Sequence, residues 1–104
     1  MSLGNILILG DSFSTFEGFI PEGYEIYYSE NTPLNTDVRK VEYTWWHQLI
    51  SKTNSNLILN DSWSGSTIGY TGYGNCDNSH SCSFIYRWRK LVEQGFFEKN
   101  TVDT

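Results

Sequence analysis

Residues 5–14 read Asn-Ile-Leu-Ile-Leu-Gly-Asp-Ser-Phe-Ser, and this stretch decides the fold class. Its apolar residues follow one another without alternation, which is typical of a β-strand covered on both faces, as in a parallel sheet. Gly10 allows a sharp turn where the strand ends, and the Asp11 side chain can accept hydrogen bonds from the amides that follow. Because chemistry gathers at the carboxyl ends of strands in an open parallel sheet, we expect Ser12 to lie at a functional site.

A second segment repeats this arrangement of an apolar strand followed by small polar residues. Residues 56–60 predict another strand, and residues 60–67 continue as Asn-Asp-Ser-Trp-Ser-Gly-Ser-Thr at the start of a loop rich in Gly, Ser and Asn. Glycine lets a backbone amide approach a ligand closely, as a donor to an oxyanion must. Of the glycines in this loop, we select Gly65 as a candidate binding residue.

Two amphipathic helices are expected between and after these strands. Thr44 is a suitable N-cap for a helix that continues to about residue 53. The apolar face of this helix is expected to comprise Trp45, Trp46, Leu49 and Ile50. Ser83 can cap a second helix over 84–94, with Gly95 as its C-terminal stop. Its expected apolar stripe consists of Phe84, Ile85, Trp88, Leu91 and Val92.

The order of these elements predicts an α/β protein. Residues 101–104 read as the first residues of a third strand, so that strand, helix, strand, helix and strand follow one another. This order is the beginning of a doubly wound parallel sheet. Residues 14–43 are expected to form a long irregular segment, which in compact domains usually shapes a site.

The segments at residues 10–14 and 60–67 resemble the first two sequence blocks of the GDSL, or SGNH, hydrolases. The resemblance implies a flavodoxin-like, three-layer α/β/α fold and hydrolysis of ester bonds, as by an esterase, a lipase or a carbohydrate esterase. Carried over residue by residue, it makes Ser12 the nucleophile and the backbone amides of Ser12 and Gly65 two donors of the oxyanion hole. Gly10 and Asp11 are supporting residues. The reaction so implied uses no cofactor and no metal.

The family's remaining catalytic sequence blocks are not found at their usual places in the chain. No Gly-x-Asn-Asp block, the source of the third oxyanion donor, occurs in the sequence. Residues 77–80 read Asp-Asn-Ser-His and fit the family's Asp-x-x-His block, but they stand far ahead of its usual place. We interpret them as a surface loop and keep Asp77 and His80 as an alternative dyad. We therefore expect residues 1–104 to form a single partial domain, truncated and inactive by itself.

Composition narrows the choice of partners. The net charge of -5 disfavours binding to nucleic acid or to an anionic membrane, and no apolar run approaches the ~20 residues that span a bilayer. We expect no signal peptide in the few residues ahead of the first strand, and the localisation stays open. The expected partners are a small ester substrate and, at the open edge of the sheet, a second copy or a complementing C-terminal segment. For Cys76 and Cys82, a disulfide and two free thiols both remain open. A zinc site formed with Asp77 and His80 is a third alternative, although its spacing matches no common structural pattern.

Two other classes of protein compete with the hydrolase. A nucleotide-binding unit can begin with the same strand and turn, but neither glycine-rich phosphate-binding motif is present. A non-catalytic carbohydrate-binding or structural fragment would use the aromatic residues, which make up 16% of the chain. Carbohydrate-binding modules are mostly β-sandwiches, whereas two amphipathic helices are expected here.

Overall fold

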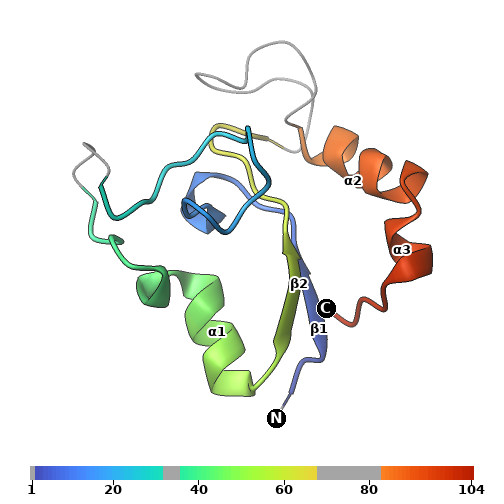
Figure 1. Ribbon diagram of the computed structural model, residues 1–104, viewed down its shortest axis with the longest axis horizontal. Helices are drawn as coiled ribbons and strands as arrows, with labels where there is room; N and C mark the ends of the chain where they lie inside the picture. The colour runs from blue at the N-terminus through green and yellow to red at the C-terminus, as the bar shows by residue number, and fades with distance from the viewer. Residues whose placement is uncertain (1, 32–35, 68–82) are drawn as a thin grey trace.

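A computed structural model of the chain describes residues 2–31, 36–67 and 83–104. Its elements, in chain order, are β1 (Asn5–Ile8), η1 (Ser12–Ser14), η2 (Val41–Tyr43), α1 (Trp45–Thr53), β2 (Asn56–Asn60), α2 (Phe84–Glu93) and α3 (Phe96–Lys99). In Figure 1, α1 lies on one side of the two strands, and α2 and α3 lie on the other. The architecture is therefore three-layered α/β, as expected.

The sheet is parallel and consists of two strands, β1 and β2, within the described residues. β1 pairs with β2 from Asn5 opposite Asn56 to Ile8 opposite Asn60, with one irregularity in register between Ile6 and Leu7. On its other side, β1 is hydrogen-bonded to the end of the chain. The Thr104 amide donates to the Asn5 carbonyl at 3.1 Å, and the Leu7 amide donates to the Thr104 carbonyl at 2.9 Å. These two bonds follow the pattern of parallel pairing, so the last residues lie where a third strand of a flavodoxin-like sheet would begin.

The apolar core lies between the sheet and α1. Ile6, Ile8, Phe16 and Trp46 form a buried cluster. The expected cap of α1 is present, since the Thr44 side chain accepts a hydrogen bond from the His47 amide. The expectation that Trp45 belongs to the buried face was wrong, because its side chain is 49% exposed. Successive helical residues point about 100° apart, so only Trp46 of this pair faces the strands.

On the opposite layer, α2 leaves most of its apolar stripe exposed. Ser83 caps the helix as predicted, and Gly95 follows it with a φ of +74°. Of the expected apolar stripe, however, only Leu91 is buried, and Trp88 and Val92 are 47% and 53% exposed. The fully buried Arg87 takes their place on the inner face. The burial of Arg87 was not predicted, and the hydrogen bonds that satisfy its guanidinium are described below.

The short helix α3 was not predicted. It follows Gly95 directly and carries Phe96 and Phe97, whose rings are half-buried and lie 5.4 Å apart between centroids. Phe97 also packs on Trp88, with 4.7 Å between ring centroids. In the part of the chain that the structure describes, no helix is both long enough and apolar enough to cross a membrane.

Candidate active site

Ser12 is the first residue of η1, four residues beyond the end of β1. Asp11 caps this turn, because its side chain accepts a hydrogen bond from the Phe13 amide at 3.2 Å. The Ser12 carbonyl accepts hydrogen bonds from both the amide and the hydroxyl of Thr15, at 3.2 and 2.7 Å. The backbone on both sides of Ser12 is thus held by local hydrogen bonds, and its side chain is half-buried.

Gly10 is required by close packing. A Cβ atom there would lie 2.6 Å from the Ser14 Cβ and 2.9 Å from the Ser62 Oγ, and closer still to the Ser14 Oγ. Its φ is not among the positive values of the described glycines. The expected sharp turn therefore does not depend on a left-handed backbone at Gly10. Glycine is needed because the exit of β1 packs closely against Ser14 of η1 and against Ser62 in the segment that follows β2.

The loops that follow β1 and β2 meet at the Gly10 carbonyl. This oxygen accepts hydrogen bonds from the Trp63 amide and from the Ser66 hydroxyl, each at 3.2 Å. The Ser66 amide in turn donates to the Trp63 carbonyl at 3.2 Å and closes a four-residue turn. Gly65 occupies the third position of this turn with a φ of +88°, a backbone region that favours glycine. The turn with Gly65 is therefore attached two residues ahead of Ser12.

Three donors beside this junction make no hydrogen bond to the part of the chain that the structure describes. Over residues 2–31, 36–67 and 83–104, the backbone amides of Ser12 and Gly65 donate to no protein atom, and neither does the Ser12 hydroxyl. Backbone amides are strong donors, and those buried in a protein are nearly always paired. These groups are therefore available to a ligand oxygen.

Asn60, the last residue of β2, is hydrogen-bonded to η1. Its Nδ2 donates to the Ser14 carbonyl at 2.8 Å, and its Oδ1 accepts from the Ser62 hydroxyl at 2.5 Å. The Ser14 carbonyl also accepts from the Trp46 indole at 2.9 Å, and the Ser14 Oγ accepts from the Trp45 indole at 3.0 Å. Neither Ser14 nor Asn60 was expected from the sequence to support the site. Their polar character where buried strands end was the available signal.

Arg87 reaches the same junction from α2. Its guanidinium donates to the Gly10 carbonyl at 3.2 Å, to the Ser66 Oγ at 3.0 Å and to the Asp61 carbonyl. Its Nε donates to the Ser83 carbonyl at 3.3 Å. No sequence pattern indicated this role, because the four acceptors are distant from Arg87 in the chain or belong to the turn that starts its own helix.

The half-buried Tyr24 and the buried Asp61 form a polar pair beside Arg87. Burial raises the pKa of Tyr24 to about 12, and the Asp61 carboxylate, which accepts a hydrogen bond from Tyr24, adds to the shift. Burial also raises the pKa of Asp61, although the Arg87 charge opposes this effect. Burial lowers the pKa of Arg87 against the influence of Asp61. The Tyr24 ring stacks on Trp63 with 4.3 Å between centroids, which connects this pair to the turn with Gly65.

Residues 4–97 match the family of GDSL-like lipases/acylhydrolases. The chain belongs to this family. No curated protein matches it. Two crystal structures assigned to the GDSL-like lipases resemble it: one from Bacteroides ovatus ATCC 8483, with 47% identity and a TM-score of 0.75, and one from Bacteroides uniformis ATCC 8492, with 38% identity and a TM-score of 0.69.

The alignments cover most of this GDSL-like chain but less than half of each relative. They extend over 86% and 83% of the chain, against 44% of the Bacteroides ovatus protein and 41% of the Bacteroides uniformis protein. The family, the α/β fold and a family-level ester hydrolase chemistry follow from these matches. The roles of individual residues do not follow from them.

Several of the residues selected from the GDSL-like sequence lie outside the described part of the structure. Asp77 and His80, the alternative dyad, are among residues 68–82, as are Cys76 and Cys82. Within the described residues, no three His, Cys, Asp or Glu side chains gather as a metal site.

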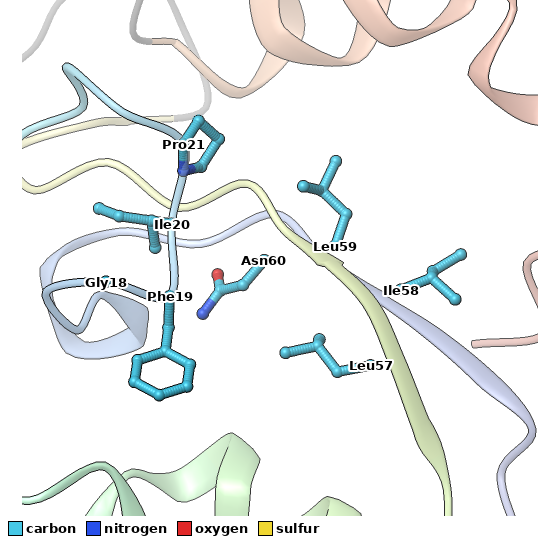
Figure 2. A pocket seen from close by; sticks show the side chains of 8 residues that line it. All are labelled: Gly18, Phe19, Ile20, Pro21, Leu57, Ile58, Leu59 and Asn60. Carbon is cyan, nitrogen blue, oxygen red and sulfur yellow. The ribbon is translucent and has the colours of Figure 1, made fainter.

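A hollow of about 430 Å³ lies along β2, beside the segment of residues 18–21. Figure 2 shows this segment passing the carboxyl end of β2, where Asn60 lies. The lining is largely apolar and includes Phe19, Ile20 and Leu57, but neither Ser12 nor Gly65. This hollow is therefore distinct from the junction that carries the candidate catalytic groups.

Phe13, the neighbour of Ser12, presents an aromatic surface to solvent. Its ring is 60% exposed. It stacks on Tyr28 at 6.1 Å and meets Tyr27 edge-on at 5.9 Å between centroids. Other aromatic residues that the sequence places in loops serve packing, as Phe16 does in the core. Among the loop aromatics that the structure describes, Phe13 directly follows Ser12 in the chain, and Tyr27 and Tyr28 pack against it.

Proposed function

We propose that this protein is a serine ester hydrolase whose nucleophile is the Ser12 hydroxyl. The backbone amides of Ser12 and Gly65 bind the oxyanion, and Gly10 and Asp11 hold the turn that presents Ser12. The observation that carries this proposal is the junction at the Gly10 carbonyl. There, two loops of a GDSL-like fold are hydrogen-bonded together, while the groups needed for acyl transfer make no hydrogen bond to the described protein.

The proposed reaction is acyl transfer in two steps. A base removes the Ser12 proton as the oxygen attacks the ester carbonyl, and the carbonyl oxygen becomes an oxyanion held by the two amides. Collapse of this intermediate expels the alcohol, which takes the proton back from the base. The acyl group stays bound to the Ser12 oxygen. Water then attacks the acyl group, releases the acid and restores the hydroxyl. The exposed Phe13 cluster offers a surface for the uncharged part of a small ester.

The base and a third oxyanion donor have to come from elsewhere. The chain has no Gly-x-Asn-Asp block, and loss of one oxyanion donor typically lowers the rate by about 10²–10³-fold. We infer that the 104 residues alone hydrolyse esters poorly and that a further polypeptide segment completes the site. The open edge of the sheet is the proposed place for that segment or for a second copy of the chain.

A chimera tests the role of Ser12. Residues 4–97 replace the aligned segment of the Bacteroides ovatus protein, and hydrolysis of p-nitrophenyl acetate is measured with the parent protein as positive control. Ser12→Ala is expected to lower turnover by at least about 10³-fold, because the nucleophile is lost. Ser51→Ala, at an exposed position of α1, is the matched control and should keep the turnover rate of the unsubstituted chimera. Unchanged turnover in the Ser12→Ala chimera would contradict the proposal.

The 104-residue chain is assayed in parallel. We expect turnover close to the buffer background. Enzyme-like turnover that both Ser12→Ala and His80→Gln abolish would instead assign the base to the alternative dyad of Asp77 and His80. It would also overturn the inference that a further segment is needed.

A further inference from the structure

The guanidinium of Arg87 lies where three segments of the fold converge. It donates to the Gly10 carbonyl in the loop after β1, to the Asp61 carbonyl and the Ser66 Oγ in the loop after β2, and to the Ser83 carbonyl at the start of α2. The side chain is 0% exposed. One side chain therefore connects both loops of the candidate active site with the helix behind them.

Burial of this charge is costly, which makes its placement informative. An arginine is almost never fully buried unless its donors are satisfied and its charge is balanced. Here the acceptors are backbone carbonyls and a hydroxyl, and the compensating charge is Asp61. The Phe84 ring, 4.9 Å from the guanidinium carbon, covers the group from the side. The same helix buries Arg87 while it leaves the large apolar side chain of Trp88 exposed.

Two of the acceptors of Arg87 lie next to the amides of Ser12 and Gly65, the proposed oxyanion donors. The Gly10 carbonyl precedes Ser12 by two residues, and Ser66 follows Gly65 directly. A guanidinium presents its donors in a rigid planar fork, so carbonyls bound to it are held in a fixed relative geometry. Lysine has the same charge but no such fork.

We propose that Arg87 is the positioning residue of the oxyanion hole: it sets the placement of the turn with Gly65 relative to Ser12. The proposal rests on the proposed function for the role of those two amides. The positioning itself is a property of the loops and can be measured without any catalytic assay.

The test uses the 104-residue chain labelled with ¹⁵N, in its natural form and as Arg87→Met, Arg87→Lys and Arg89→Met. Arg89 is the matched control because it lies on the exposed face of the same helix. Arg87→Met is expected to move the amide resonances of Ser12 and Gly65. It should also speed hydrogen exchange at the Trp63 amide by at least about tenfold relative to the Asn56 amide.

These two reference amides separate positioning from general stabilisation. The Trp63 amide donates to the Gly10 carbonyl at the junction, whereas the Asn56 amide donates to the Gly4 carbonyl at the other end of the sheet. If Arg87 only stabilised the fold, exchange at both amides would accelerate by the same factor. Equal acceleration, or unmoved resonances at Ser12 and Gly65, would overturn the proposal. Arg87→Lys should restore the resonances in part, and Arg89→Met should leave them in place.

Two further results keep the test decisive. Should Arg87→Met fail to fold, Ser66→Ala removes one acceptor of Arg87 without leaving a buried unpaired charge. It should move the same resonances by a smaller amount, and no movement would refute the proposal. An unchanged rate in the Ser12→Ala chimera would refute the proposed function while the measured positioning stands. The two failures are thus distinguishable.

Discussion

Replacing Gly10 by alanine would place a methyl group where the exits of the two strands are packed together. The new Cβ would lie 2.6 Å from the Ser14 Cβ and 2.9 Å from the Ser62 Oγ, so an atom must move. Ser14 cannot move freely, because Trp45, Trp46 and Asn60 donate hydrogen bonds to it. We therefore expect a large destabilisation from this single methyl group.

The magnitude follows from two contributions. Overpacking of a buried site costs about 1–3 kcal/mol. Displacement of Ser14 weakens hydrogen bonds that contribute about 1 kcal/mol each. The free energy of unfolding should fall by about 3 kcal/mol, which shifts the urea midpoint by about 1.5 M at a slope of about 2 kcal/mol/M.

Urea unfolding followed by tryptophan fluorescence measures this loss. Gly23→Ala is the matched control, since no atom lies within 4 Å of its Cβ position although its φ is +89°. It should cost only the backbone strain, about 1 kcal/mol. In the double variant Gly10→Ala/Ser14→Gly, the closest contacts vanish and part of the loss is recovered, with a coupling of at least about 1 kcal/mol. If the two single alanine variants lost equal stability, or if the coupling were near zero, the packing argument would be refuted.

Two further predictions concern α1 and the half-buried Tyr24. Thr44→Ala removes the side chain that accepts from the His47 amide and donates to the Val41 carbonyl, and should cost about 1–2 kcal/mol in urea unfolding, whereas Thr44→Ser should keep most of it. The pKa of Tyr24, raised from 10.0 to about 12, implies stability that is present below pH 10 and is lost as the pH rises toward 12. The difference in unfolding free energy between the natural chain and Tyr24→Phe should therefore shrink over pH 10–12, and a constant difference would contradict this assignment.

Local signals predicted the elements of the fold, and distant partners explain the errors. The strand at residues 56–60 and the caps Thr44 and Ser83 depend on neighbouring residues, and the structure has them as expected. The burial of Arg87 in α2 was not predicted because apolar periodicity takes no account of hydrogen bonds to segments far away in the chain. Arg87 donates to the carbonyls of Gly10 and Asp61, which lie in those segments.

The candidate site divides in the same way. Ser12 and Gly65 were selected from short motifs, and the structure brings their two loops together at one carbonyl, while their catalytic roles remain predictions. Asn60 had a signal in the sequence, its polar character at the end of a buried strand, but Tyr24 and Arg87 had none. A lone tyrosine or arginine is common on protein surfaces, and only the folded chain reveals that these two are packed beside the loops.

The described residues bury a polar assembly around the strand ends in addition to their small apolar core. Its members are Ser14, Thr15, Asn60, Asp61, Ser62, Ser66, Ser83 and Arg87. Hydrogen bonds add little net stability, but a buried polar group left unpaired is costly, so such an assembly admits few alternative arrangements. Substitutions in it should therefore alter the geometry around Ser12 at least as much as the stability of the fold. The proposed site, in which two backbone amides would hold an ester carbonyl, needs that property, because those amides cannot be repositioned by changing their own side chains.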